Sequence, residues 1–140
     1  PRFIGDVKSG TVKPQAVPEL VGGLQRNNVN VENILVDPLV QPLSVDGTFG
    51  VEFINTIEKI IETFPGIHTA CGLSNISYGL PARKFMNQTF MTMAIAKGLD
   101  SAIINPLDRE MMAGIIATEA LACRDRFYMN YLKVFRAGFF

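Results

Sequence analysis

Short β-prone runs and longer runs with helical spacing alternate along the chain. The short runs cover 2–7, 33–36, 67–73 and 100–104. In the longer runs apolar residues recur every three or four positions, which is typical of amphipathic helices. These runs cover 14–28, 51–64, 84–97, 109–123 and, at the end of the chain, 125–135. We therefore predict four strand–helix units followed by one further helix.

The alternation of strands and helices predicts an α/β fold with a parallel sheet and right-handed crossovers. The run N-I-L-V at 33–36 does not alternate between apolar and polar residues, so we expect this strand to be buried on both faces. Two architectures fit this pattern, an open doubly wound sheet and part of a (β/α)₈ TIM barrel. No Gly-x-Gly-x-x-Gly follows the first strand, which weakens a dinucleotide-binding interpretation.

A barrel interpretation implies that this chain holds only half of a domain. A complete barrel has eight units and about 250 residues, whereas this chain has 140 residues and four predicted units. Half a barrel would expose two strand edges and the inner face of its sheet. We therefore expect the remainder on another chain, outside this sequence, or replaced by self-association. The start at Pro1, without Met, also suggests a fragment or a processed product.

Composition narrows the possible partners. The chain is 48% hydrophobic, enough for a packed core. Its 13 basic residues form no cluster and are balanced by 13 acidic ones, which argues against nucleic acid. No apolar run reaches about 18 residues, so we expect no membrane span. The two cysteines fit no metal-binding spacing, and we interpret them as reduced thiols of a cytoplasmic protein.

Polar residues gather where the predicted strands end. Asp37 ends the second strand, Asn75 follows the third, and Asn105 follows the fourth. The connection within 71–90 is long and polar for a strand-to-helix joint, where about two to six residues are usual. In a barrel, these strand ends form the rim that holds the active site. We therefore predict that the three side chains converge there.

Several kinds of chemistry are disfavoured by the residues present. The only histidine, His68, begins a strand and so lies away from that rim. No His, Cys or Glu joins the polar residues there, so we predict no metal site. Ser74 has no histidine partner nearby and no Gly-x-Ser-x-Gly elbow is present, which excludes a hydrolase triad.

The remaining set of Asp, amides, serines and an Arg favours recognition of a neutral or anionic organic ligand. Asp37 could accept two parallel hydrogen bonds from an amino-amide heterocycle, and Asn75 could serve a group whose protonation changes. Arg83 could bind a carboxylate or support the loop. Each residue also has a structural alternative. Asp37 could form a turn before Pro38, Asn75 could bond loop backbone, and Arg83 could lie on the surface.

Five motifs, in chain order, resemble those of the pterin-binding methyltransferases over about 31–136. The resemblance is to the methyltetrahydrofolate:corrinoid/iron–sulfur protein methyltransferases and their relatives in corrinoid-dependent demethylation, and more distantly to the folate domain of cobalamin-dependent methionine synthase. The motifs are I-L-V-D-P-L-V at 34–40, G-L-S-N-I-S at 72–77, G-L-P-A-R at 79–83, N-Q-T-F at 87–90 and G-L-D-S-A-I-I-N-P at 98–106.

The resemblance implies a dihydropteroate synthase-like (β/α)₈ barrel, of which residues 1–140 would form the C-terminal half, with about four βα units. It implies methyl transfer between nitrogen 5 of tetrahydrofolate and the cobalt of a corrinoid protein that carries cobalamin. The tetrahydrofolate or 5-methyltetrahydrofolate is then the substrate, and the protein needs no metal of its own. The corrinoid protein would be one partner, and a second copy or a complementing N-terminal half would be another.

The resemblance also implies roles for individual residues. Asn75 would be catalytic, beside the reacting nitrogen, where it stabilises the protonated form and so improves the leaving group. Asp37 would contact the pterin ring. The predicted substrate-binding set is completed by Ser74, Arg83 and Asn105. The family's other pterin-binding Asp and Asn residues come from earlier strands, which this chain lacks.

Two alternatives stay open. Dihydropteroate synthase shares the fold and the pterin, but it typically has S-R-K after the equivalent strand, where this chain has S-N-I. The other alternative is a non-catalytic half-barrel assembly unit that binds no folate.

Overall fold

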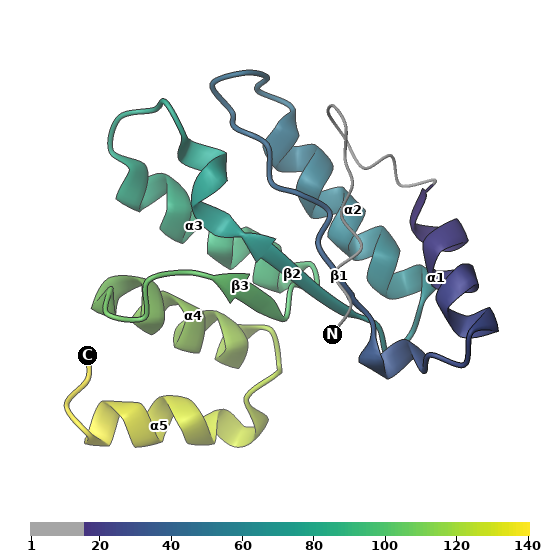
Figure 1. The fold of residues 1–140 in the computed structure, drawn as a ribbon. Helices are drawn as coiled ribbons and strands as arrows, with labels where there is room; N and C mark the ends of the chain where they lie inside the picture. Colours follow the sequence, from purple (N-terminus) through teal and green to yellow (C-terminus); the bar gives the residue numbers. More distant parts are fainter. Residues whose placement is uncertain (1–15) are drawn as a thin grey trace.

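The computed structural model describes residues 16–140, in which helices and strands alternate as the sequence predicts (Figure 1). The expected first strand at 2–7 and the first residues of the expected helix at 14–28 lie outside the described residues. The described elements are α1 (Ala16–Arg26), β1 (Leu35–Val36), α2 (Phe49–Thr63), β2 (His68–Gly72), α3 (Arg83–Ala96), β3 (Ser101–Ile103), α4 (Arg109–Leu121) and α5 (Met129–Arg136). Short 3₁₀ helices cover Val31–Asn33, Leu73–Ser77 and Arg126–Tyr128.

The described strands form one parallel sheet in chain order, β1-β2-β3. Leu35 lies opposite His68, and Cys71 lies opposite Ala102. The prediction of an α/β fold with a parallel sheet is therefore confirmed. Because all three strands run the same way, their carboxyl ends lie along one edge of the sheet.

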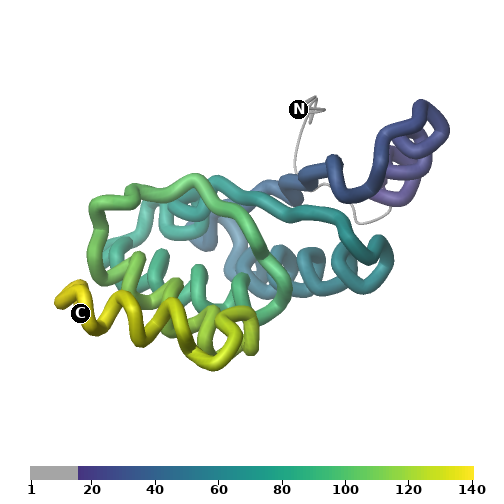
Figure 2. The backbone as a smooth tube through the Cα atoms, turned by 90° about the horizontal axis from the view of Figure 1, so that it is seen from below, coloured from purple at the N-terminus to yellow at the C-terminus, as the bar shows by residue number. Residues whose placement is uncertain are grey.

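The first and last helices lie at opposite ends of the molecule (Figure 2). Val17 and Val21 of α1 are buried in a small cluster with Ile34, Ile60 and Ile67. Helix α1 is thus attached through α2 and the beginnings of β1 and β2. Helix α5, in contrast, contains no buried residue.

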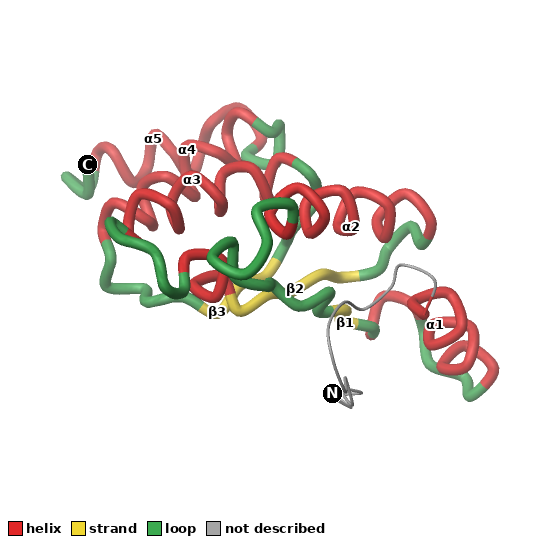
Figure 3. Tube along the Cα trace, turned by 90° about the horizontal axis from the view of Figure 1, so that it is seen from above, coloured by secondary structure: helices red, strands yellow, loops and turns green. Residues whose placement is uncertain are grey.

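The main core lies between the sheet and helices α2, α3 and α4, which cover the same face (Figure 3). Ile57 of α2, Cys71 of β2 and Ala94 of α3 are fully buried there. Full burial of a large aliphatic side chain contributes about 1.5–3 kcal/mol, so this layer supplies most of the hydrophobic stabilisation. The loop after β2 joins the same core through Leu73 and Ile76.

The opposite face of the sheet is open in the described part of the chain. Leu35 is 53% exposed and Ile103 is 78% exposed, although both lie within strands. The prediction that the strand at 33–36 is buried on both faces is therefore wrong for Leu35. Successive strand residues point to opposite faces, so Ile34 enters the core while Leu35 points to the side that no described helix covers.

The last helix begins later than the sequence predicts. We expected it from residue 125, but α5 begins at Met129 after a 3₁₀ turn in which Phe127 has a positive φ of 57°. The Asp125 carboxylate accepts the backbone N–H groups of Asn130 and Tyr131. Asp125 therefore caps the first turn of the helix without belonging to it.

Candidate functional site

The loop after β2 contains one 3₁₀ segment, Leu73–Ser77, that fixes which side chains face outward. A 3₁₀ helix has three residues per turn, so Leu73 and Ile76 share one side, and both are buried. Ser74 and Asn75 are exposed. The apolar residues of G-L-S-N-I-S thus anchor the segment, and its polar residues are presented at the sheet edge.

The Asn75 amide lies close to the end of β2. A Cβ atom added at Gly72 would be 3.6 Å from Nδ2 of Asn75, so the amide folds back towards the strand that precedes it. Within residues 16–140 this side chain makes no hydrogen bond, while its backbone carbonyl accepts the N–H of Tyr78 at 3.1 Å. The alternative in which Asn75 bonds loop backbone is not seen in the described part, and the amide can serve a ligand.

The loop after β1 supports the loop after β2. The backbone N–H of Leu43 donates to the carbonyl of Ile76 at 3.0 Å, and Oγ of Ser44 donates to the carbonyl of Tyr78 at 2.7 Å. Gly79 has a φ of 79°, and a Cβ there would lie 3.1 Å from Oγ of Ser44. Only glycine avoids both the strain and the close contact at this position.

Arg83 is engaged by the same loop. Its Nε donates to Oγ of Ser77 at 3.0 Å, and its Nη2 donates to the carbonyl of Ser74 at 2.8 Å. Ser77 is fully buried, and its hydroxyl donates to the Ser74 carbonyl at 3.2 Å. Of the two roles expected for Arg83, this geometry corresponds to support of the loop.

Asp37 follows β1 and forms a turn with one oxygen, while its other oxygen has no hydrogen-bond partner within residues 16–140. Its Oδ1 accepts the N–H of Leu39 at 2.8 Å, as expected for a turn former. Partial burial raises the pKa of the Asp37 carboxyl, and the Leu39 hydrogen bond opposes this shift. Burial, with a smaller contribution from the Asp37 charge, raises the pKa of Cys71 to about 12. The carboxylate therefore lies within electrostatic reach of β2.

Asn105 and Asp108 follow β3 and shape the turn into α4. The Asn105 side-chain oxygen accepts the N–H of Leu107 at 3.0 Å, and the Asp108 carboxylate caps α4 by accepting the N–H of Met111 at 3.1 Å. Asn105 retains its amide group as a possible donor. The parallel sheet thus places Asp37, Asn75 and Asn105 after neighbouring strands along one edge.

His68 lies at the opposite end of β2, as predicted. Its Nδ1 is 2.7 Å from Oδ2 of Asp100, whose other oxygen accepts the N–H of Thr69 at 3.0 Å. This pair joins the beginnings of β2 and β3. Among residues 16–140, no group of three or more His, Cys, Asp or Glu side chains is arranged to hold a metal ion.

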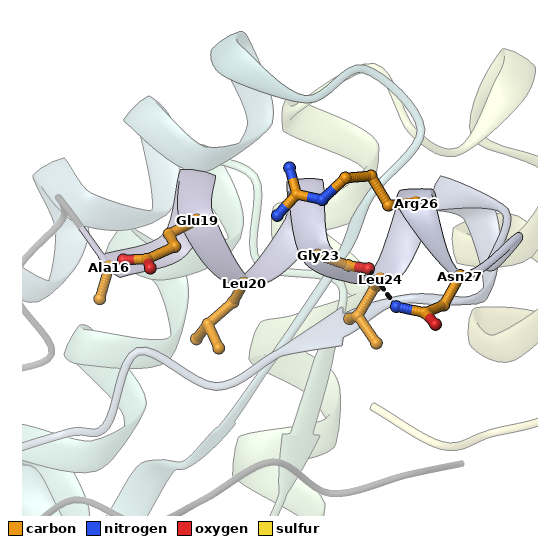
Figure 4. Close-up of a pocket in the computed structure, with 7 residues that line it drawn as sticks. All are labelled: Ala16, Glu19, Leu20, Gly23, Leu24, Arg26 and Asn27. Atoms are coloured by element: carbon orange, nitrogen blue, oxygen red, sulfur yellow. Dashed lines mark hydrogen bonds between the residues drawn. The ribbon is translucent and has the colours of Figure 1, made fainter.

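Two hollows of the described surface lie away from the predicted site. One, of about 630 Å³, runs along α1, where Leu20 and Leu24 point to the same side and Asn27 bonds the Gly23 carbonyl (Figure 4). A second, of about 220 Å³, lies between α1 and α2. The predicted site residues Asp37, Asn75 and Asn105 follow the carboxyl ends of the strands instead. None of the described helices is both long and apolar enough to cross a membrane.

The roles of two serines of the site loops, Ser44 and Ser77, were not predicted from the sequence. Ser44 supports the loop by donating to the carbonyl of Tyr78, which is distant in sequence, and the buried Ser77 supports it by accepting from Arg83. Asn87 has a buried side-chain oxygen without a partner in the described part of the chain. The motif G-L-S-N-I-S includes Ser77. The burial of this residue and its hydrogen-bond partner, however, could not be inferred from the local sequence.

Comparison with known proteins supports the resemblance. The chain is 44% identical over 126 residues to methylcorrinoid:tetrahydrofolate methyltransferase of Eubacterium limosum, a match that covers 90% of this chain and 46% of that protein. It is 31% identical over 108 residues to methionine synthase of Mycobacterium tuberculosis, covering 72% of this chain and 9% of that protein. A similar match is found with methionine synthase of Mycobacterium leprae. No protein-family model matches the chain.

This chain therefore spans about half the length of the first of these relatives and a small part of the other two. The matched proteins are a tetrahydrofolate–corrinoid methyltransferase and methionine synthases. The motifs at 34–40 and 72–106 suggested these same two classes of enzyme. The resemblance inferred from the motifs is confirmed: over 90% of its length, this chain is a relative of a tetrahydrofolate–corrinoid methyltransferase.

Proposed function

We propose that this chain supplies one wall of the folate site in a methyltransferase that acts between tetrahydrofolate and a corrinoid protein. The observation that carries the proposal is the 44% identity to methylcorrinoid:tetrahydrofolate methyltransferase over 90% of the chain. The position of Asn75 at the carboxyl edge of the sheet, with an amide that makes no hydrogen bond within residues 16–140, supports it. Cobalamin would be held by the partner protein, and tetrahydrofolate or its 5-methyl form would be the substrate.

We also propose that the sheet belongs to a (β/α)₈ barrel, of which residues 1–140 form the C-terminal half. Two observations favour this over a doubly wound sheet. The described strands follow chain order, and α2, α3 and α4 cover one face, whereas a doubly wound sheet carries helices on both faces. The open face, with Leu35 and Ile103, would then line the barrel interior and meet the rest of the barrel.

The polar side chains suit a pterin at this edge. Asp37 offers the carboxylate edge that Leu39 leaves unused, which can accept hydrogen bonds from the amino-amide side of the ring. Ser74 and Asn105 lie on the neighbouring loops and offer further hydrogen bonds.

Asn75 would act where charge changes. In either direction of transfer, one N–C bond and one Co–C bond exchange, and the electron pair of the broken bond stays on the atom that the methyl group leaves. The Asn75 oxygen can accept a hydrogen bond from protonated nitrogen 5, and its Nδ2 can donate to the unprotonated nitrogen. An amide fixed beside this atom therefore stabilises the charge that develops during transfer.

The test is titration of methyltetrahydrofolate and measurement of methyl transfer with the native protein that contains this chain. Loss of a preorganised hydrogen bond to a developing charge lowers the rate about 100-fold or more, which is the result expected for Asn75→Ala. The control is Asn55→Ala, an exposed residue on α2. Equal affinity and equal rates for wild type and Asn75→Ala would exclude the role of Asn75. Absence of binding by the wild type would favour an assembly unit instead.

A further inference from the structure

The loop that carries Asn75 is held by a polar contact between the exposed Arg83 and the buried Ser77, which the sequence motifs do not assign. The two donors of Arg83 reach different points of the loop, the Ser77 hydroxyl at 3.0 Å and the Ser74 carbonyl at 2.8 Å. These acceptors flank Asn75 in the sequence. The Ser77 hydroxyl donates in turn to the Ser74 carbonyl at 3.2 Å. We call these three residues the Arg83 clamp.

We propose that the Arg83 clamp positions the Asn75 amide, so that Arg83 and Ser77 act on methyl transfer through Asn75 and not by contact with folate. This inference rests on the proposed function for its catalytic consequence. Its structural part, the restraint of the loop, stands on the contacts alone.

The geometry explains why a guanidinium is needed. The Ser74 carbonyl and the Ser77 hydroxyl are separate acceptors, and the planar fork of Arg presents two N–H groups to them at once. A Lys ammonium is a compact point charge on a flexible stem and does not reproduce this fork. Without the guanidinium, the buried Ser77 hydroxyl would lose the donor that it accepts and keep only its own bond to the Ser74 carbonyl.

The clamp also connects the loop to a rigid element. Arg83 is the first residue of α3, and α3 packs in the main core through Phe90, Met91 and Ala94. Ala82, which precedes it, has a positive φ of 50°, so the chain turns sharply into the helix. Two attachments to the core therefore restrain Asn75. One is the buried side chain of Ile76, and the other is Arg83 at the start of α3.

A positioning role and a ligand-binding role of Arg83 make different predictions. In the native protein that contains this chain, Arg83→Gln is expected to lower kcat for methyl transfer ~10- to 100-fold, as small misplacements of a catalytic group do. The KM for methyltetrahydrofolate is expected to change less than about threefold, since binding contacts stay in place. Arg83→Lys is expected to restore little of the rate. Combined with Asn75→Ala, Arg83→Gln is expected to cause no further loss.

Amide hydrogen exchange over residues 72–80 tests the restraint without any substrate. Exchange of this segment is expected to rise in Arg83→Gln and in Ser77→Ala, because the loop loses part of its support. The control is Arg136→Gln, which removes the same charge from an exposed arginine of α5. If Ser77→Ala does not fold, the Arg83→Gln result decides alone.

Three outcomes would overturn the inference. One is unchanged loop exchange in Arg83→Gln. Another is a loss of affinity seen with methyltetrahydrofolate but not with an analogue that lacks the glutamate tail, which would make Arg83 a carboxylate ligand. The third is full additivity with Asn75→Ala. If the wild type neither binds folate nor transfers methyl groups, the proposed function fails, while the exchange measurement still decides whether the clamp restrains the loop.

Discussion

At the residue scale, Cys71 sits where the core meets the candidate site. The thiol is fully buried between β2 and the helices, and the Asp37 charge adds to the burial that raises its pKa. Ionisation would place a second negative charge in a dry environment beside the first. Cys71 is therefore held as a neutral thiol, with a pKa raised to about 12 from an ordinary value of 9.0.

This shift predicts a loss of stability in alkaline solution. Between pH 9 and pH 12 the unfolded chain loses the thiol proton while the folded chain keeps it. The folded state then binds more protons, so the free energy of unfolding falls as pH rises, by up to about 1.4 kcal/mol per pH unit from this group. Denaturant melts at pH 8, 9, 10 and 11 would measure the slope.

Two variants isolate the contribution of Cys71. Cys71→Ala should be less stable than wild type at pH 8, because it leaves a small cavity, but its stability should fall less steeply above pH 9. Cys123→Ala removes an exposed thiol and should retain the wild-type slope. Parallel slopes for wild type and Cys71→Ala would show that the thiol does not resist ionisation in the folded chain.

Two non-glycine residues of the site loops have left-handed backbone conformations. Leu39 has a φ of 58° and Ala82 a φ of 50°. Such conformations cost roughly 1–2 kcal/mol each for residues with a Cβ. Leu39 is compensated by the Asp37 carboxylate, which accepts its N–H, and Ala82 precedes the clamped Arg83. Each of the two strained residues therefore lies next to a hydrogen bond that holds its loop.

At the element scale, Gly98 ends α3 and sets the approach of α3 to α2. Its φ is +116°, and a Cβ there would lie 2.9 Å from Cγ1 of Ile61. Gly98→Ala therefore combines backbone strain with a clash against a branched side chain. We expect a loss of about 2–4 kcal/mol in the free energy of unfolding, measured by urea denaturation.

A suitable control for Gly98→Ala is Gly114→Ala in α4. A Cβ at Gly114 meets nothing within 4 Å, and its backbone is helical. Alanine there should stabilise the helix by about 0.5–1 kcal/mol. If both substitutions had effects of the same sign, the tight packing assigned to the end of α3 would be incorrect.

The helices and strands were largely predictable because local pattern and tertiary contacts agree. Helix α2 was expected at 51–64 and occupies Phe49–Thr63, with Phe53 and Ile57 on its buried face. The strand at 33–36 shows where the reasoning failed. A continuous apolar run indicates that both faces of the strand are covered in the complete protein. It does not indicate whether the residues that cover them belong to the same chain.

The candidate site was predictable in part. The rule that polar residues gather at the carboxyl ends of parallel strands placed Asp37, Asn75 and Asn105 on neighbouring loops, as the sheet order now shows. The rule gave no distances between them and no hydrogen bonds. The partners of Arg83 could not be predicted, because they depend on how a 3₁₀ turn aims a carbonyl and a buried hydroxyl towards the start of a helix.

At the scale of the whole molecule, the described helices cover only one face of the sheet. The helix-covered face carries the main core, whereas the other face presents Leu35 and Ile103 beyond the reach of any described helix. Large apolar side chains exposed on one face of a sheet are uncommon in a complete domain, where such patches mark interaction surfaces. In the proposed half barrel, this face is the inner surface. Strand β3 is then an edge strand whose unpaired backbone groups can bond a further strand.

The last prediction follows from that open face. If it meets the complementary half of a barrel, Ile103→Ala should weaken association of this chain with a separately produced N-terminal half of the related methyltransferase. Loss of most of an Ile side chain from a buried contact weakens binding at least about tenfold, or about 1.4 kcal/mol. Since Ile103 is 78% exposed in this chain, the free energy of unfolding of the chain alone should change by less than about 0.5 kcal/mol.

The matched control is Val51→Ala, a 58% exposed position on α2 away from the open face, which should change neither quantity. Isothermal titration of the two halves measures the affinity. Equal weakening by both variants would show that the open face is not the interface between the two halves. No association of the wild-type halves would contradict the half-barrel proposal itself.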